Sequence, residues 1–279
     1  MTSKSTWAQT HSGKNQGVAL LAVLWLVAAL SVMIGGLQHV VRGEIRIANQ
    51  LRNTVVHDAI ADAAIRLVLQ QLAMDQNKSA KSTQTRTVSV FGSEVTVEIV
   101  PLNGFVDLNN APASLLADTF EYAGGASKED AQRLAASAVQ ARDRQGAEGV
   151  PEKFHAVEDL LRLPGMDYKV YAKMKPVLTV DIVGAGRVNP LAATLETLAI
   201  LANGDLARAQ QIIQSRLSNS ASMDTTSLAS TDMETAPTSY LALRAASVTP
   251  DNTRLVRTWR VDMASAAYGL PWRVLGIDP

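Results

Sequence analysis

The N-terminal part of the chain carries a long, uninterrupted apolar stretch. Residues 18–37 read VALLAVLWLVAALSVMIGGL, and no charged residue occurs between Asn15 and Val41. A stretch of about 20 mostly apolar residues is long enough to cross a bilayer as a helix, whereas the apolar region of a cleavable signal peptide spans only about 7–15 residues. We therefore predict a retained membrane helix over residues 18–40, with the short N-terminus in the cytoplasm and the larger part of the chain on the other side.

Beyond this stretch, apolar residues recur every three or four positions, which is typical of an amphipathic helix. The series is Ile45, Ala48, Leu51, Val55, Ala59, Ala63 and Leu67. No proline occurs between Val18 and Val100, so the pattern predicts one long helix of about 55 residues whose second half packs its apolar stripe on a globular domain. The alternative is two helices interrupted at Gly35-Gly36 or at Gly43, because each glycine costs a helix about 1 kcal/mol relative to alanine.

Alternating residues after residue 86 indicate a β-hairpin. Residues 87–91 and 95–100 alternate between apolar and polar around Gly92-Ser93, the pattern of two short strands joined by a tight turn. Further strands are predicted late in the chain, at residues 177–183, 253–263 and 271–277. A long helix followed by antiparallel strands predicts an α+β fold, in which the helix covers one face of the sheet.

Between the early and the late strands the sequence predicts helices. Residues 109–112 (NNAP) end the preceding strand and start a helix over residues 113–122. A tight turn at Pro164-Gly165 precedes a helix at residues 168–175, which is a helix-hairpin-helix pattern. We therefore predict a large helical insertion.

The Asn-rich helix start recurs later in the chain. Residues 187–191 read RVNPL, ahead of a helix whose apolar positions are Leu195, Leu198 and Leu201. This second helical segment is predicted to lie between the insertion and the last strands.

Composition limits the chemistry that the chain can perform. Lys and Arg together number 26, Asp and Glu together number 26, and there are four histidines and no cysteine. The balanced charge gives no overall basic field for a polyanion, and the lack of cysteine excludes disulfides, thiolate nucleophiles and cysteine zinc sites. The paired carboxylates Glu129-Asp130 and Glu158-Asp159 are explained by the preference of the helix macrodipole for acids in the first turn. We expect no catalytic residues, no metal site and no enzymatic activity.

Gly17 directly precedes the apolar stretch and ends a short polar leader that closes with Gly-Lys-Asn-Gln-Gly. This arrangement resembles the leader of type IV prepilins, in which a prepilin peptidase cleaves after the glycine on the cytoplasmic side and the new N-terminal residue is methylated. The resemblance implies cleavage between Gly17 and Val18 and N-methylation of Val18. The alternative is an ordinary signal anchor in which Gly17 is incidental.

The fifth position after the predicted cleavage is Ala22, where major pilins and most pseudopilins carry a glutamate. Residues 18–22 (VALLA) are similar to the start of the protein K family, the minor pseudopilins of the type II (general) secretion system that lack this glutamate. Later motifs follow the same order, with LNNA at residues 108–111 and LRLPGM at residues 161–166. Residues 189–191 read NPL where the family tends to read Asn-Thr-Ala, so the likeness is weaker there.

The resemblance implies a pilin-like α+β fold with a transmembrane first half of the N-terminal helix and a helical insertion. The implied divisions are a leader (1–17), a transmembrane half-helix (18–40), a periplasmic helix with the first strands (41–104), the insertion (105–176), and a second helical segment with the remaining strands (177–279).

The resemblance also implies a function in protein export. The chain would be a single-pass inner-membrane protein with a periplasmic globular domain, capping the tip of the pseudopilus that drives export of folded proteins across the outer membrane. Its partners would be the other minor pseudopilins, the major pseudopilin, the inner-membrane assembly platform and the prepilin peptidase.

Residues 218–238 form a Ser/Thr-rich segment that we predict to be a surface loop. Its acids Asp224, Asp232 and Glu234 do not match the spacing of a compact calcium loop, although pseudopilins sometimes carry calcium sites. We assign no metal ligand, and calcium is the one cofactor that the resemblance leaves open.

Helix-hairpin-helix elements are better known as DNA-binding units, so the alternative function is a membrane-anchored DNA receptor of the competence type. Between Phe105 and Val180, nine Lys and Arg stand against eleven Asp and Glu, a net charge of −2. Binding of phosphates needs an excess of positive charge, and Asp167 lies beside the hairpin where a phosphate would approach. We therefore expect no nucleic-acid partner.

Overall fold

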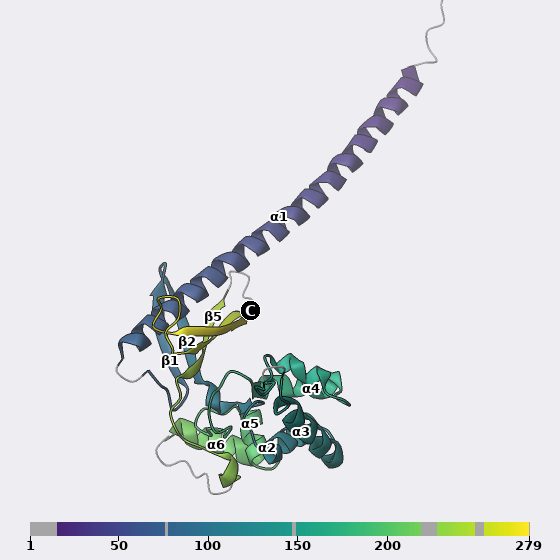
Figure 1. Ribbon diagram of the computed structural model, residues 1–279. Helices are drawn as coiled ribbons and strands as arrows, with labels where there is room; N and C mark the ends of the chain where they lie inside the picture. The colour runs from purple at the N-terminus through teal and green to yellow at the C-terminus, as the bar shows by residue number, and fades with distance from the viewer. Residues whose placement is uncertain (1–15, 76–77, 147–148, 219–227, 249–253, 279) are drawn as a thin grey trace, which may run out of the picture. The chain divides into compact units, whose positions relative to one another are not determined.

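The computed structural model describes residues 16–75, 78–146, 149–218, 228–248 and 254–278 (Figure 1). The chain divides into two compact units, Met1–Val56 and His57–Pro279. Helix α1 (Gln16–Met74) is 59 residues long and continues from the first unit into the second without a break. The predicted single long helix is therefore confirmed, and the alternative of an interruption at Gly35-Gly36 or Gly43 was wrong.

In the first unit, the described apolar side chains of α1 are exposed, from Val18 at 68% to Met33 at 76%. Ser31 satisfies its hydroxyl within the helix by donating to the Val27 carbonyl oxygen at 2.8 Å. Over the residues that the structure describes, no helix combines the length and the apolar character needed to cross a membrane. The predicted span, residues 18–40, includes residues 19 and 34–40, whose side chains lie outside the described part.

The second unit is built on a five-stranded antiparallel sheet of order β1-β2-β5-β6-β7. The strands are β1 (Gln84–Val90), β2 (Ser93–Pro101), β5 (Tyr240–Val248), β6 (Arg254–Asp262) and β7 (Arg273–Asp278). The first hairpin turns at Phe91 and Gly92, which have φ of 49° and 80°. Positive φ at both central residues is the geometry that matches the twist of paired strands. The predicted hairpin is confirmed, with its turn one residue earlier than the predicted Gly92-Ser93, because Ser93 already belongs to β2.

Two strand predictions need correction. The stretch 177–183 forms only the two-residue β4 (Leu178–Thr179), which pairs with β3 (Val106–Asp107) in parallel and outside the main sheet. In its place the main sheet contains β5, which the sequence did not predict. Alanine has low strand propensity, and the sequence of β5, YLALRAASV, contains three alanines. The strand is stable because it is central, with a partner on each edge and apolar packing on both faces.

The end of α1 covers one face of the sheet. Its buried residues are Ala61, Ala64, Ile65, Val68, Leu69 and Leu72, none more than 7% exposed. The predicted stripe was wrong here, because Ala59 is exposed and Leu67 is 40% exposed. The predicted positions advance by four residues at a time, and each such step overshoots a full turn by about 40° at 3.6 residues per turn. From Leu51 to Leu67 the predicted stripe therefore turns away from the face that it began on.

Polar contacts also join α1 to the sheet. The Trp259 indole Nε1 donates to Asp62 Oδ1 at 2.9 Å, and Arg257 Nε reaches the same oxygen at 3.2 Å. Arg66 stacks over the Trp259 ring, 5.2 Å from its centroid. These contacts fix the helix against β6.

Helices of the segment between β2 and β5 form a second layer, hereafter the helical layer, and gather in one group in Figure 1. Its elements are α2 (Ala113–Asp118), the π-helical turn η2 (Thr119–Ala123), α3 (Lys128–Arg142), the 3-10 helix η3 (Val157–Arg162), α4 (Tyr168–Met174), α5 (Leu195–Leu201) and α6 (Leu206–Ser218). Short 3-10 turns also occur at η1 (Leu102–Gly104), η4 (Lys175–Val177) and η6 (Ser230–Asp232). One apolar core runs through the layer, and its largest fully buried side chains include Phe120, Leu160, Met174 and Leu198. This core contains residues of the predicted insertion (105–176), such as Leu160, and residues that follow it, such as Leu198.

The predicted helices of this layer are found close to their predicted positions. The helix at 113–122 is α2 followed by η2, and the later Asn-initiated helix is α5, with Leu198 and Leu201 buried. The turn at Pro164-Gly165 is present, with Gly165 at φ 81°. The element before this turn is a short 3-10 helix, so the hairpin is not a pair of α-helices.

The predicted surface loop at 218–238 needs a partial correction. Residues 219–227 lie outside the described residues. Among the others, Leu228 is 5% and Asp232 7% exposed, and Val188 N donates to the Asp232 carbonyl oxygen at 2.9 Å. This part of the segment is therefore packed against the helical layer.

Candidate functional site

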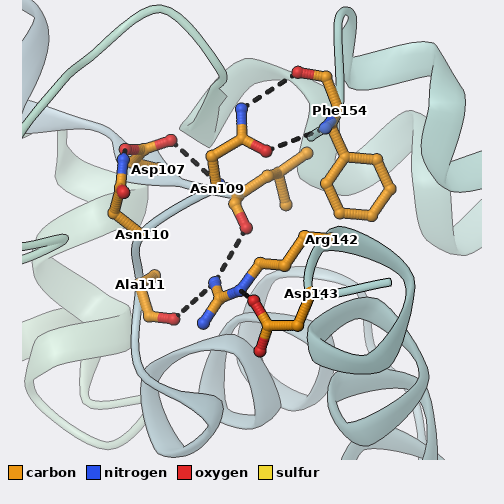
Figure 2. Close-up of polar contacts among 8 residues, drawn as sticks. Asp107, Asn109, Asn110, Ala111, Arg142, Asp143 and Phe154 are labelled. Carbon is orange, nitrogen blue, oxygen red and sulfur yellow. Dashed lines mark hydrogen bonds and ion pairs between the residues drawn. The ribbon is translucent and has the colours of Figure 1, made fainter. Parts of the chain in front are cut away.

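The loop at residues 107–111, hereafter the Asn109 loop, carries a network of polar contacts (Figure 2). Asn109 pairs with the backbone of Phe154 in both directions: its Nδ2 donates to the carbonyl oxygen at 2.9 Å, and its Oδ1 accepts from the Phe154 N–H at 2.8 Å. The same amide also donates to the Val180 carbonyl oxygen at 3.3 Å. One amide side chain therefore joins two segments that are distant in sequence.

Arg142 ties the end of α3 to the same loop. Its Nη1 donates to the carbonyl oxygens of Leu108 at 2.9 Å and of Ala111 at 2.7 Å, and its Nε lies 3.7 Å from Asp143 Oδ1 (Figure 2). A basic residue in the last turn usually interacts with the end of its own helix. Here it satisfies the carbonyls of a neighbouring loop instead.

Asp107 makes hydrogen bonds to other residues of the Asn109 loop. Its carboxylate accepts from the Asn109 backbone N–H at 3.0 Å and from Asn110 Nδ2, and Asn110 donates in addition to the Ile182 carbonyl oxygen at 3.1 Å. Burial raises the pKa of Asp107, and the two hydrogen bonds oppose that shift. These contacts satisfy backbone groups of the chain itself, so the Asn109 loop acts as a structural joint between segments.

Asn189 forms a second joint, between the helical layer and the start of the sheet. It is fully buried, its Nδ2 donates to the Lys81 carbonyl oxygen at 2.7 Å, and its backbone N–H donates to the Asn103 carbonyl oxygen at 2.7 Å. Its Oδ1 accepts from the Leu191 N–H at 3.0 Å. The sequence predicted both Asn-rich segments as helix starts. The sequence did not predict that these asparagines join separate segments of the chain. The one indication in the sequence was that the Asn-rich pattern occurs twice.

A cleft of about 590 Å³ lies between the helical layer and the sheet face opposite α1. Its sheet side is formed by Ala242 and Arg244 of β5 and by Thr258 and Arg260 of β6, and its other side by residues of η3, α4 and η4. Arg260 pairs with Asp181 and, at 3.2 Å, with Asp278. The cleft is therefore bounded by charged groups from both layers.

On the helical side of the cleft, Glu158 lies 2.8 Å from Lys175 Nζ and accepts from the Tyr171 hydroxyl at 3.0 Å. The hydrogen bond from Lys175 is the main cause that lowers the pKa of Glu158 from 4.5 to about 2, with backbone and Tyr171 hydrogen bonds adding to it. This carboxylate is therefore ionised and locally neutralised at neutral pH.

The residues predicted for processing lie together at the start of α1. Gly17 and Val18 are in its first turn, and Ala22 follows within the next two turns, with its side chain exposed. The surroundings of the Gly17 side-chain position lie outside the described residues. Cleavage after Gly17, methylation of Val18 and the role of Ala22 stay predictions.

In the helix-hairpin-helix region, the N-terminus of α4 is capped by a side chain of the chain itself. Asp167 is the N-cap of α4, and its Oδ1 accepts from the Lys169 N–H at 2.9 Å. A carboxylate at this place occupies the amide that a phosphate would use.

The described residues contain no group of three His, Asp or Glu side chains that could hold a metal ion. Of the loop acids considered for calcium, Asp224 lies outside the described residues, and burial raises the pKa of Asp232. The expectation that the chain holds no cofactor stays a prediction.

The features above define a class of protein: an α+β fold in which a long N-terminal helix packs on an antiparallel sheet and a helical layer is inserted between two adjacent strands, β2 and β5. A comparison of the sequence with known protein families and with curated proteins finds no match. The structure is similar to a chain of the crystal structure of the GspK-GspI-GspJ complex from the type 2 secretion system of enterotoxigenic Escherichia coli, with a TM-score of 0.51 and 14% sequence identity. The match covers 84% of this chain and 98% of that chain. At this identity the likeness concerns the fold, and it agrees with the mixed helix and antiparallel sheet that we predicted.

Proposed function

We propose that the chain is a minor pseudopilin of a type II secretion system, similar to the protein K family, and that it acts by assembly and has no enzymatic activity. The observation that carries the proposal is the likeness over nearly the whole length of a chain from the GspK-GspI-GspJ complex. The leader ending at Gly17 supports it independently, because the leader is a feature of the sequence and does not depend on the fold.

In this proposal the first half of α1 holds the subunit in the inner membrane, and the globular domain lies in the periplasm. Cleavage after Gly17 by the prepilin peptidase leaves that helix intact, with Val18 as the methylated N-terminus. The helix then leaves the lipid for a bundle with the helices of the other minor pseudopilins and the major pseudopilin, above the inner-membrane assembly platform.

The helical layer supports a place at the tip of the pseudopilus. It adds a separate apolar core to the sheet domain, and such bulk would obstruct a further subunit above it. Ala22 supports the same place. A carboxylate in hydrocarbon is costly unless it is paired, and alanine at the fifth mature position cannot make the pairing with the N-terminus of a neighbouring subunit that the pilin glutamate makes.

The proposal is tested by expressing the full chain in its own cells, purifying it, and measuring both its N-terminal mass and the pseudopilins that co-purify with it. We expect a mature N-terminus at a methylated Val18 and recovery of the other minor pseudopilins. Gly17→Val should leave the leader in place, because the peptidase requires a small residue at the scissile bond. Gly13→Val, four residues earlier in the same leader, is the matched control and should be processed normally.

A mature chain that begins at Met1 or far beyond Val18 would contradict the pilin-type processing. Normal processing without any co-purifying pseudopilin would contradict the assembly role.

A further inference from the structure

The sequence contains two Asn-Gly dipeptides, Asn103-Gly104 and Asn203-Gly204. Asparagine is a chemically labile residue, and it loses its amide most readily before glycine, because glycine has no side chain to hinder attack by its backbone nitrogen on the asparagine carboxamide. The two dipeptides share this local chemistry. A difference between their reactivities in the folded chain therefore comes from the fold.

Asn103 is held on every side and is only 6% exposed. Its Nδ2 donates to the Ala236 carbonyl oxygen at 2.9 Å, and its Oδ1 accepts from Asn189 Nδ2 at 3.4 Å. Its own carbonyl oxygen accepts from the Asn189 N–H at 2.7 Å, and Gly104 lies directly against the backbone of Ala192. Attack by the Gly104 nitrogen requires the carboxamide to rotate, so these contacts must first break and the helical layer must separate from the start of the sheet.

Asn203 lies instead in the exposed turn between α5 and α6. Asn203 and Gly204 have φ of 56° and 87°, and their N–H groups donate to the carbonyl oxygens of Ile200 at 3.1 Å and of Ala199 at 2.8 Å. This is the Schellman arrangement that ends a helix. Among the residues that the structure describes, none forms a hydrogen bond with the Asn203 side chain.

The carboxamide of Asn203 is therefore free to rotate, and the Gly204 nitrogen becomes available when one hydrogen bond of the turn opens. Local opening at the end of a helix costs far less free energy than the separation of packed layers. The reactive arrangement is consequently reached much more often at Asn203 than at Asn103.

We propose that Asn203 is the site at which the folded chain deamidates spontaneously and that the fold protects Asn103. The Gly204 backbone nitrogen gives its proton to hydroxide and attacks Asn203 Cγ. A new C–N bond closes a five-membered succinimide, and the C–N bond of the carboxamide breaks to release ammonia. Water then opens the ring at either carbonyl and yields aspartate or isoaspartate. The reaction requires no further reactant and does not depend on the proposed function.

Either product disturbs the junction of α5 and α6. A carboxylate replaces a neutral amide at the C-terminal end of α5, where the helix macrodipole disfavours negative charge. Isoaspartate also adds a methylene group to the main chain before Gly204. There is little room for this, because a Cβ on Gly204 would already lie 2.8 Å from Tyr122 Cδ1. The deamidated chain should therefore melt at a lower temperature than the fresh chain.

The test is a time course of the full chain in detergent micelles at mildly alkaline pH, followed by trypsin digestion and mass spectrometry. Cleavage after Arg and Lys places the two sites in separate peptides, residues 87–128 and 188–208. In the second peptide the other asparagine, Asn189, precedes Pro190 and cannot react in this way, because proline has no backbone N–H. We expect deamidation at Asn203 to be at least about tenfold faster than at Asn103, a difference of about 1.4 kcal/mol in opening free energy.

The same time course in concentrated urea is the control for local chemistry, and there the two sites should react at similar rates. Asn203→Gly is the matched variant, because glycine adopts the same positive φ and carries no carboxamide. It should abolish the reaction in the peptide 188–208 and leave the rate at Asn103 unchanged. Its melting temperature should stay constant during the incubation, while that of the unmodified chain falls.

Three outcomes would overturn the proposal. Equal rates at the two sites in the folded chain, or a faster reaction at Asn103, would show that burial does not protect Asn103. A tenfold difference that persists in urea would assign the selectivity to the neighbouring sequence. Reaction of Asn203 in urea but not in the folded chain would show that the turn protects this site as well.

Discussion

Gly104 lies where the chain leaves β2 for the helical layer, and its lack of a side chain permits a close approach of two backbones. A Cβ at this position would lie 2.6 Å from both the carbonyl carbon and the oxygen of Ala192. Ala192 follows Asn189, the residue that joins the helical layer to Lys81 and Asn103. Because glycine has only a hydrogen atom in place of a side chain, the backbone at Gly104 can lie close to Ala192, and the contacts of Asn189 can form.

Gly104→Ala should therefore destabilise the protein by about 1–3 kcal/mol, the cost of overpacking where backbone must move. Gly184→Ala is the matched control, because its Cβ would meet only Ile182 Cγ2, at 3.8 Å, and should change stability by no more than about 0.5 kcal/mol. Chemical denaturation of both variants measures the difference. Equal stability of the two would show that the chain relaxes at Ala192 without cost.

The contacts of Glu158 predict that the free energy of unfolding depends on pH in the acid range. Its folded pKa is lowered to about 2, so the stabilisation that it provides is fully present above its usual pKa of 4.5 and is lost as the pH falls from 4.5 toward 2. Because its side chain is 51% exposed, solvent screening keeps that contribution below about 1 kcal/mol. Glu158→Gln should lower the free energy of unfolding at pH 7, and the deficit should vanish near pH 2.

The control for this titration is Glu94→Gln, on the exposed first hairpin. As a substitution of an exposed residue, it should change the free energy of unfolding at pH 7 by no more than about 0.5 kcal/mol. A Glu158→Gln deficit that stays constant over this range would mean that the charge of Glu158 is not what stabilises the fold.

At the scale of elements, two leucines near the end of α1 show which face of the helix packs on the sheet. Leu69 is fully buried against the sheet, whereas Leu67, two residues before it, is 40% exposed. Two residues along a helix correspond to a rotation of about 200°, so the two side chains point in nearly opposite directions.

Leu69→Ala should lower the free energy of unfolding by about 2–5 kcal/mol, because it leaves a cavity beneath the sheet. Leu67→Ala removes the same atoms from a partly exposed position and should cost well under half as much. Thermal or urea unfolding of the two variants measures which leucine contributes more to stability and therefore which face of α1 packs on the sheet. A larger loss of stability for Leu67→Ala than for Leu69→Ala would mean that the apolar stripe predicted from the sequence, which contains Leu67, is the one that packs on the sheet.

The sequence was informative about elements with strong local signals. The long helix, the Phe91-Gly92 hairpin and α5 follow from periodicity, turn chemistry and the absence of proline. Strand β5 could not be predicted in this way, because alanine-rich strands are stabilised by neighbours on both sides and not by their own propensity. The stripe on α1 failed for a related reason, since the face that is buried depends on where the sheet lies.

The candidate site was predictable only in part. The positions of Asn109 and Asn189 were noticed, but the backbone groups that they satisfy come from residues up to 108 positions away. No local pattern records such partners. The cleft is likewise a product of the fold, because Arg244 lies on the strand that the sequence did not predict.

At the scale of the second unit, two arginines of β6, three positions apart, hold the sheet to different layers. Arg257 reaches Asp62 of α1 at 3.2 Å, whereas Arg260 reaches Asp181 after β4 and thereby the helical layer. Arg260 is given room by Gly276 on β7, where a Cβ would lie 2.3 Å from its Nη2, and by an irregularity in the pairing of β6 with β7 beside it. Each face of the sheet is therefore held by an ion pair of β6 in addition to its apolar contacts, and Arg86 of β1 pairs with Asp75, just after α1, at 2.9 Å.

This arrangement predicts that the two layers can be loosened separately. Arg260→Gln leaves the Asp181 carboxylate, only 13% exposed, without its cation, which costs about 1–3 kcal/mol. Local opening of a layer is visible in native-state hydrogen exchange before global unfolding. We expect faster amide exchange at residues 178–182 and in α4, with little change in residues 57–74. Arg257→Gln is the matched variant and should do the opposite, with a smaller effect because Trp259 still donates to Asp62. If both variants accelerate exchange equally in both layers, the second unit opens as a single cooperative body, and the ion pairs do not act on separate layers.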